Sequence, residues 1–314
     1  MPGSRDNPGT RGNTAEITLR LPIADEAGAD PAGLLDLARR AEEAGFHAVS
    51  LSDHVVMGPN VDRYPWGDFP FSPAAPWVEP LTMLTAIAGV TRDLRLTTGI
   101  LIVPLRPAAL LAKWAATIDV VSGGRLELGV GTGWQEEEFG ALGLDHSSRG
   151  RLLTDYIGAC RALWSDSPAA FESPTVSFSE IWCEPKPTRP GGPPILFSGT
   201  LTERNRRRIV ELGDGWIPIM GARRSEVKDG TDALRELFSA AGRPPEALRV
   251  RCAARVIDSD VSATIESASV LVDAGVTDVD IAFSQMARDR EDFAQFFDAA
   301  EKAISTAGWV ARRG

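Results

Sequence analysis

A complete strand–helix–strand pattern occupies residues 94–134, which read LRLTTGILIVPLRPAALLAKWAATIDVVSGGRLELGVGTGW. The first apolar, β-branched run, Leu94–Leu101, is typical of a buried strand. A helical pattern begins at Pro107 and ends at Gly123-Gly124, and a second strand-like run, Leu126–Val130, follows it. The helix face expected to point inward carries Leu111, Trp114, Ala115 and Ile118. This order of elements predicts a βαβ unit, whose two strands run parallel.

The same alternation extends through most of the chain. Apolar runs of strand length recur at Ile17–Leu21, Ala48–Leu51, Leu94–Leu101, Leu126–Val130, Pro194–Ser198, Gly215–Ile219, Leu248–Val256 and Thr277–Phe283. The clearest of the intervening helices takes Asp30 as its N-cap and Pro31 as its first helical residue, and ends at Gly45. About eight such units predict an α/β fold, a closed (β/α)8 TIM barrel. A doubly wound open sheet is the rival, but the GxGxxG motif usual after its first strand is missing.

The chain of 314 residues is expected to form one barrel domain over residues 15–314. The first 14 residues are polar and rich in Gly and Pro, which predicts a flexible tail rather than a secretory signal. Two segments are longer than the loops of a simple (β/α)8 barrel and are expected to be insertions. Val55–Val78, after strand 2, is rich in prolines and aromatic residues, and a long loop at a barrel mouth often forms a lid or a substrate wall. Ser165–Gly192, after strand 4, is predicted to contain two short strands, Phe171–Phe178 and Ile181–Glu184.

The composition excludes several classes of protein. The formal net charge is −10, from 33 lysines and arginines against 43 aspartates and glutamates, so a nucleic-acid partner is not expected. No apolar run approaches the roughly 20 residues that a membrane span needs. Three cysteines without CxxC spacing and only three histidines argue against a disulfide framework and against a metal site. We therefore expect a cytoplasmic protein without metal, membrane or nucleic-acid ligands.

Candidate functional residues stand where predicted strands end, which is where barrels carry their active sites. The second strand ends in Ser52-Asp53-His54. His54 could act as a general acid or base or bind a cofactor ring, and the rival interpretation is an Asp–His pair that only fixes the following loop. The third strand ends in Thr97-Thr98-Gly99-Ile100-Leu101, where a glycine indicates a bulge, a close approach to a flat ligand, or tight packing.

The fourth and fifth strands end in loops rich in small residues. The fourth runs into Gly131-Thr132-Gly133-Trp134, whose glycines could let a ligand approach the backbone. The acidic run Glu136–Glu138 after it is read as complementing a helix dipole. The fifth ends in Ser198-Gly199-Thr200, where Thr200 and Glu203 could form a capping box and free N–H groups could bind a phosphate. An ordinary capped helix with a solvated arginine face (Arg204, Arg206, Arg207 and Arg208) remains the alternative.

Seven segments, in their order and spacing, resemble one protein family. They are Ala41–Phe46 leading to Ser52-Asp53-His54, Leu111–Asp119, Ser122–Leu126, Gly129–Trp134, Glu184–Pro187 and Leu212–Trp216. Together they resemble the luciferase-like monooxygenase superfamily, over about residues 17–283. Within it, the chain is most similar to the branch of oxidoreductases that use the deazaflavin coenzyme F420.

The resemblance implies a (β/α)8 fold that binds coenzyme F420 or FMN at the barrel mouth. It implies that Asp53 and His54 lie beside the cofactor ring. It implies a bulge with a non-proline cis peptide, at the positions of Thr98, Gly99 and Ile100, against the other face of the ring. The residues implied to line the same pocket are Gly131, Thr132, Gly133 and Trp134, and those implied to hold the phosphate are Ser198, Gly199 and Thr200.

Two departures from the family pattern refine the expected activity. Trp134 stands where sugar-phosphate dehydrogenases of this branch place a catalytic glutamate, which argues against that activity. No arginine stands near Thr132, where FMN-using luciferases carry one for the flavin phosphate, so the pattern favours the deazaflavin. The expected reaction is hydride transfer between F420 and a small organic substrate, with His54 moving the proton and Asp53 orienting His54. Trp134 and the Tyr64–Trp77 aromatics would wall the substrate side.

Other functions predict different behaviour. With FMNH2 the same site would belong to an oxygen-using monooxygenase, which needs a partner reductase. A non-catalytic flavin-binding barrel would have Trp134 blocking the pocket. A serine hydrolase is disfavoured because no GxSxG motif occurs. The apolar helix faces are expected to support a homodimer.

Overall fold

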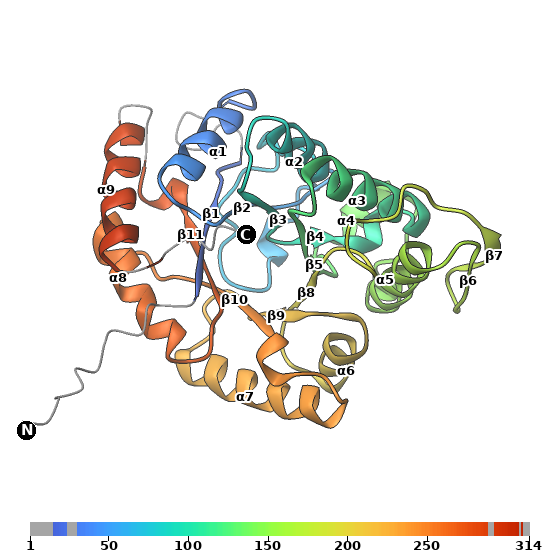
Figure 1. Ribbon diagram of the computed structural model, residues 1–314. Coiled ribbons are helices and arrows are strands. Elements are labelled where there is room, and N and C mark those ends of the chain that lie inside the picture. The colour runs from blue at the N-terminus through green and yellow to red at the C-terminus, as the bar shows by residue number, and fades with distance from the viewer. Residues whose placement is uncertain (1–14, 24–29, 288–291, 308, 310–314) are drawn as a thin grey trace, which may run out of the picture.

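The computed structural model of the protein describes residues 15–23, 30–287, 292–307 and 309. Residues 1–14, expected to form a tail, lie outside this part. Eight parallel strands close a barrel through the pairing of β3 with β5, which confirms the predicted (β/α)8 fold (Figure 1). The barrel strands are β1 (Glu16–Arg20), β2 (Ala48–Leu51), β3 (Arg95–Thr98) with its continuation β4 (Leu101–Ile102), β5 (Leu126–Gly131), β8 (Ile195–Ser198), β9 (Gly215–Ile217), β10 (Arg249–Ala253) and β11 (Asp278–Ala282).

Helices surround the barrel and connect its strands (Figure 1). They are α1 (Gly33–Glu43), α2 (Pro80–Ala88), α3 (Ala108–Ser122), α4 (Glu136–Ala141), α5 (Arg149–Ser165), α6 (Glu203–Leu212), α7 (Arg224–Ala240), α8 (Val261–Val272) and α9 (Asp292–Thr306). Short 3₁₀ turns occupy Val61–Arg63, Val103–Leu105, His146–Ser148, Pro245–Ala247 and Phe283–Gln285. Within the described residues, no helix is long and apolar enough to cross a membrane.

The predicted helix signals are mostly confirmed, with two corrections. Asp30 Oδ1 accepts a hydrogen bond from the amide of Gly33 at 2.6 Å, as an N-cap does, although the regular helix begins only at Gly33. Gly123 ends α3 in the left-handed conformation, at φ 70°. The inward placement of Trp114 was wrong, because this side chain is 38% exposed on the outer face of α3.

The insertion after strand 4 forms a two-stranded antiparallel hairpin, as the prediction of a small β unit required. Its strands are β6 (Ala169–Glu172) and β7 (Ser177–Ile181), so the predicted boundaries were wrong. The turn falls between them, where the hydroxyl of Ser173 accepts a hydrogen bond from the amide of Val176 at 3.0 Å. A serine whose hydroxyl bonds the backbone a few residues further on favours a turn, and here the turn interrupts the apolar run.

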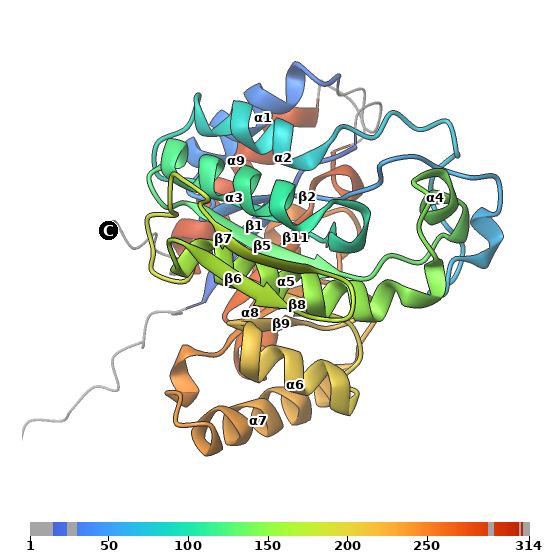
Figure 2. The ribbon, with the colours of Figure 1, turned by 90° about the vertical axis from the view of Figure 1, so that its right-hand side faces the viewer.

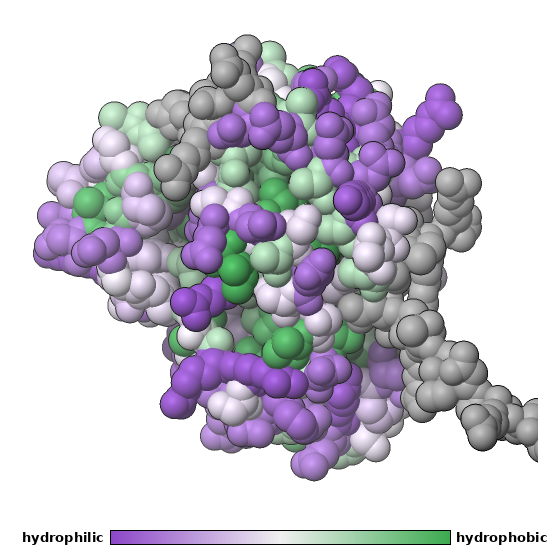
Figure 3. Space-filling view, turned by 90° about the vertical axis from the view of Figure 1, so that its left-hand side faces the viewer, coloured by the Kyte–Doolittle hydropathy of each residue, from purple (hydrophilic) through white to green (hydrophobic). Residues whose placement is uncertain are grey.

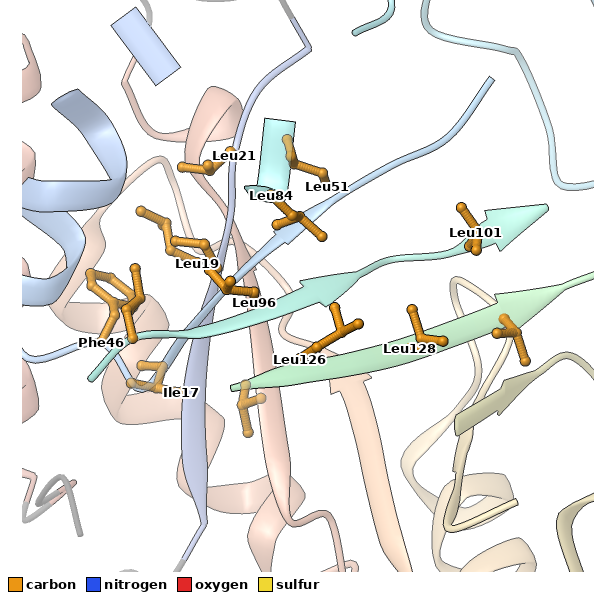
Figure 4. Packing of buried hydrophobic residues seen from close by; sticks show 14 of the residues in the cluster. Ile17, Leu19, Leu21, Phe46, Leu51, Leu84, Leu96, Leu101, Leu126 and Leu128 are labelled. Atoms are coloured by element: carbon orange, nitrogen blue, oxygen red, sulfur yellow. The ribbon is translucent and has the colours of Figure 1, made fainter. Parts of the chain in front are cut away.

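Apolar side chains pack between the barrel and its helices. On β1, Ile17 and Leu19 point outward and are fully buried, while Thr18 points into the lumen. Figure 4 shows Leu19 of β1, Leu96 of β3 and Leu84 of α2 in this apolar layer. The alternation along each strand therefore sends apolar residues to the helices and leaves the lumen to polar ones.

Charged residues from three strands fill the lumen beneath the mouth. Arg251, which is 1% exposed, donates to Asp278 at 2.7 Å and to the hydroxyl of Thr97 at 2.5 Å, and also pairs with Glu127. Burial alone would raise the pKa of Glu127 and of Asp278, but the neighbouring guanidinium groups hold both pKa values below their usual range. This network, which the sequence reasoning missed, forms a rigid polar floor under the candidate site.

Candidate active site

His54 lies just beyond β2 at the barrel mouth and is bound to a carboxylate from another element. Its side chain is 7% exposed, and its Nδ1 lies 3.1 Å from Oε2 of Glu138 in α4. The other carboxylate oxygen of Glu138 accepts from the amide of Val55 at 2.6 Å. Because Glu138 accepts at both oxygens, the simplest arrangement places the proton on Nδ1 and leaves Nε2 as the reactive nitrogen. Nε2 has no hydrogen-bond partner among the residues that the structure describes.

The short helix α4 holds the long loop after β2 over the mouth. Oε1 of Gln135 accepts from the amide of Gly58 at 2.8 Å, and Nε2 of Gln135 donates to the carbonyl of Gly58 at 3.1 Å. Asn60 donates to the carboxylate of Glu137. A Cβ atom on Gly58 would lie 2.5 Å from Cβ of Glu137, so only glycine allows this close approach. Figure 2 shows the loop and α4 side by side beyond the strand ends.

The acidic run therefore does more than complement a helix dipole. Sequence reasoning missed Glu138, which is fully buried. A usable signal was present, because Gln135 and Glu138 are three residues apart and so face the same side of the helix start.

Aromatic side chains from the loop surround His54. Its ring makes edge contacts with Trp77, Phe69 and Trp134, with ring centroids 4.8, 5.9 and 6.0 Å away. Tyr64 in turn packs against Trp134 at 5.3 Å. The structure thus brings Trp134 together with the aromatics of the Tyr64–Trp77 segment, as the sequence predicted. Rings packed in this way exclude water from the imidazole.

Asp53 is turned away from His54, which corrects its expected role of orienting the imidazole. Arg106 forms a two-pronged ion pair with Asp53, with N–O distances of 2.7 and 2.9 Å, and the amide of Ile102 donates to Asp53 at 2.8 Å. Arg106 also donates to Glu79 at 2.8 Å. Although burial alone would lower it, these two carboxylates raise the pKa of Arg106. Asp53 therefore fixes the backbone beyond the third strand.

The bulge between β3 and β4 contains a cis peptide at Gly99-Ile100, as the family resemblance implied. Thr98 points away from the mouth, is fully buried, and donates its hydroxyl hydrogen to the carbonyl of Gly129 at 2.7 Å. Gly129 itself is required by that approach, because a Cβ there would lie 2.2 Å from the carbonyl oxygen of Thr98.

The glycines of the fourth loop are explained by protein packing. A Cβ on Gly131 would lie 2.7 Å from Cδ1 of Ile100, and a Cβ on Gly133 would lie 2.7 Å from Cγ2 of Ile102. Gly133 also has a positive φ of 74°. Thr132 is half-buried between them, and its hydroxyl lies 3.4 Å from the carbonyl of Gly133. The structure thus brings Ile100, Gly131, Thr132, Gly133 and Trp134 together on one side of the mouth.

The loop after β8 is held in shape by its carbonyl groups. Nδ2 of Asn205, a residue that sequence reasoning missed, donates to the carbonyls of Ser198 and Thr200 at 3.3 and 3.2 Å. The indole of Trp216 donates to the carbonyl of Gly199 at 2.8 Å, and the amide of Gly199 donates to Ile217 at 3.0 Å. The expected capping box was wrong, because Thr202 caps α6. The hydroxyl hydrogens of Ser198 and Thr200 remain available, since they are donated to no described residue.

The histidine–carboxylate pair and the aromatic wall lie at the mouth of a closed α/β barrel, which is where (β/α)8 enzymes carry their active sites. The chain belongs to the luciferase-like monooxygenase family, whose model matches residues 15–311. This is a family of oxidoreductases and monooxygenases. In the part of the chain that is described, no group of three or more His, Cys, Asp or Glu side chains could hold a metal ion.

Relatives and a solved structure agree with this assignment. The chain is 30% identical over 264 residues to the uncharacterized protein Rv0940c of Mycobacterium tuberculosis, covering 82% of this chain and 87% of that protein. It is 30% identical over 209 residues to the FMNH2-dependent dimethylsulfone monooxygenase of Pseudomonas putida, covering 66% of this chain and 53% of that protein. The fold matches an F420-dependent secondary alcohol dehydrogenase in complex with an F420–acetone adduct, with a TM-score of 0.73, 18% identity, and coverage of 93% and 99% of the two chains.

Proposed function

We propose that this protein is an oxidoreductase that uses coenzyme F420 to transfer a hydride to or from a small organic substrate at the barrel mouth. The observation that carries the proposal is His54, nearly buried, bound through Nδ1 to Glu138 and free at Nε2. A nitrogen held this way can give or take the proton that accompanies hydride transfer. The missing arginine near Thr132 favours the deazaflavin over FMN, and the barrel is a fold that an F420-dependent dehydrogenase also has.

The residues present fit such a cofactor. The hydroxyls of Ser198 and Thr200 precede the amino end of α6, a set of donors suited to a phosphate. Ile100 and the loop Gly131–Trp134 would border the ring, and His54 would stand on its edge. Bound F420 would supply the hydride-carrying carbon of its ring.

The chain's own side chains would prepare the substrate. Nε2 of His54 would hold a proton against the substrate oxygen or remove it. Glu138 would fix the ring of His54 and offset its positive charge. Trp77 and Trp134 would keep water away, which strengthens these interactions. We place this reaction in the cytoplasm, as the sequence suggests.

The alternative is an FMNH2-dependent monooxygenase that takes its reduced flavin from a partner reductase. The observation that favours it is the 30% identity to the dimethylsulfone monooxygenase. In that case Ser198 and Thr200 would hold the FMN phosphate without help from an arginine near Thr132.

Anaerobic titration with F420 and with FMN, each oxidised and reduced, separates the two functions. Binding is followed by fluorescence and by the shift in melting temperature. Binding of F420 alone supports the hydride-transfer proposal and directs screens to small alcohols and electron-poor carbonyl compounds. A preference for reduced FMN would establish the alternative. Binding of neither would overturn both.

We also propose that the protein forms a homodimer through α3. Its outer face exposes Leu110, Trp114, Thr117 and Val121, whose 4-3-4 spacing matches the apolar seam of paired helices. Trp114 is 38% and Val121 is 58% exposed. The opposite flank of the molecule, with α8 and α9, shows hydrophilic residues with smaller apolar areas between them (Figure 3). A second copy related by a two-fold axis would present an identical seam to this one.

Val121→Glu is expected to convert the protein from dimer to monomer, because it buries a charge in the seam without a partner. Light scattering after size-exclusion chromatography should give about twice 33.7 kDa for the native chain and 33.7 kDa for the variant. The matched control is Leu237→Glu, at a 37% exposed leucine of α7, which should remain dimeric. A monomeric native chain would refute the dimer.

A further inference from the structure

Arg208 is a nearly buried cation without an acidic partner. The residue, in α6, is 7% exposed. Its guanidinium donates to the hydroxyl of Thr154 at 2.7 Å and to the carbonyl of Gly150. Both acceptors are neutral, and no described carboxylate forms an ion pair with Arg208. Buried charges in proteins are normally compensated by an opposite charge, so this one lacks an expected counter-ion.

A second guanidinium approaches the same point. A Cβ atom placed on Gly150 would lie 3.5 Å from Nη1 of Arg204 and 3.6 Å from Nη2 of Arg208. Both cations therefore converge on the one residue at the start of α5 that has no side chain. Burial and the charge of Arg204 lower the pKa of Arg208 to about 10. Two like charges held together in this way repel each other unless an anion lies between or beside them.

Two more arginines flank this point. Arg149 and Arg151 stand on either side of Gly150, and neither forms an ion pair within the described part of the chain. The acidic surplus of the whole protein, with a net charge of −10, makes a group of four unpaired arginines stand out. Several cations on the residues around the start of α5 and the start of α6 suit a ligand with more than one negative charge.

We propose that Arg204 and Arg208 form an anion site that binds the acidic tail of the cofactor beyond its phosphate. This inference rests on the proposed use of coenzyme F420, whose phosphate carries a chain of glutamate residues. The site lies next to the loop Ser198–Thr200. Only two residues separate this loop from α6, and Arg204 is the second residue of α6. FMN ends at its phosphate and would leave these arginines uncompensated.

The competing explanation is that Arg208 only ties α6 to the start of α5. That role accounts for the hydrogen bonds of Arg208 to Thr154 and Gly150. It does not account for Arg204, which is exposed, forms no ion pair with an acid in the described part of the chain, and yet reaches the same residue, Gly150. Arg204 is therefore the residue to change, since its loss leaves the link between the helices intact.

The test compares binding of three ligands to the native protein, to Arg204→Gln and to Arg206→Gln. The ligands are the deazaflavin core without phosphate, F420 with no glutamate, and F420 with several glutamates. Arg206 is an exposed arginine of the same helix, so its variant controls for the loss of one positive charge. In the native protein and in Arg206→Gln, the Kd of F420 with several glutamates should be about five- to tenfold lower than the Kd of F420 with none. In Arg204→Gln most of this difference should be lost.

A separate arm keeps the site testable if the chain does not bind the deazaflavin. Triglutamate alone should raise the melting temperature of the native protein and of Arg206→Gln, and have little effect on Arg204→Gln. The tighter binding of F420 with glutamates and the rise in melting temperature with triglutamate should both become smaller at high salt. Failure of the deazaflavin core to bind would refute the proposed function and leave the triglutamate result to decide the anion site. Equal binding of F420 with and without glutamates, no effect of triglutamate, or equal losses in both variants would overturn the inference.

Discussion

His54→Gln is expected to lower kcat by at least about 100-fold while the Kd of the cofactor changes little, because a positioned acid–base group contributes roughly 10²–10⁴ in rate. Glutamine has a similar reach and can still bond to Glu138, but it cannot give up or take a proton at neutral pH. The aromatic rings around His54 stay packed against a side chain of similar size, so the fold should persist. Steady-state kinetics and fluorescence titration of the cofactor measure the two quantities separately.

Glu138→Gln distinguishes a positioning role from a purely structural one. The amide removes the negative charge beside the imidazole and leaves its size unchanged. The amide can still accept from Nδ1 but no longer offsets positive charge on the ring, so kcat should fall while the Kd of the cofactor and the melting temperature change little. A purely structural role would lower the melting temperature and leave the kcat of the folded protein unchanged. Unchanged turnover in His54→Gln, with cofactor bound, would remove His54 from the mechanism.

Arg251→Met is expected to destabilise the protein by about 3–5 kcal/mol, the usual cost of removing one partner from a buried ion pair. The variant leaves Glu127 and Asp278 buried with less positive charge around them. Methionine fills most of the space, so the loss reports charge rather than a cavity. The free energy of unfolding in urea, or the melting temperature, provides the measurement.

A matched surface change and the pH dependence sharpen this prediction. Arg207→Gln removes an exposed ion pair with Glu211 and should change stability by no more than about 0.5 kcal/mol. Because the lumen lowers the pKa values of Glu127 and Asp278, the unfolded chain binds more protons than the folded one at low pH. The native protein should therefore lose stability as the pH falls below about 4. The difference in the free energy of unfolding between the native protein and Arg251→Met should become smaller in that pH range. An Arg251→Met variant as stable as the control would refute the network's role.

The barrel could be predicted because its signals are local. Strand-length apolar runs and the stops at Gly45 and Gly123 depend only on neighbouring residues. Their alternation was enough for the number of βα units. The inward placement of Trp114 failed because a helix pattern gives the periodicity of faces, and an outer apolar seam repeats with nearly the same period as the inner one.

The partners within the site could not be predicted, because they are set by contacts across the fold. Asp53 and His54 are adjacent in sequence, and yet they bind Arg106 and Glu138, which lie 53 and 84 residues away. The glycines of the fourth loop were interpreted as letting a ligand approach the backbone, and only the folded chain places Ile100 and Ile102 beside Gly131 and Gly133. The lumen charges alternate with apolar residues along their strands, a pattern that equally fits residues exposed to solvent.

The loop over the mouth has two parts, a first part that is hydrogen-bonded to the α4 segment and a central part with few bonds to it. Residues 55–60 are bonded to Gln135, Glu137 and Glu138 of the α4 segment. From Val61 to Pro76, the described hydrogen bonds stay within the loop, and an exposed ion pair from Arg63 to Glu136 is the one link to α4. Substitutions in this central part, at positions other than Phe69, whose ring contacts His54, can reshape the substrate wall without moving the imidazole. Evolution can thus alter selectivity here while retaining the proton-transfer apparatus.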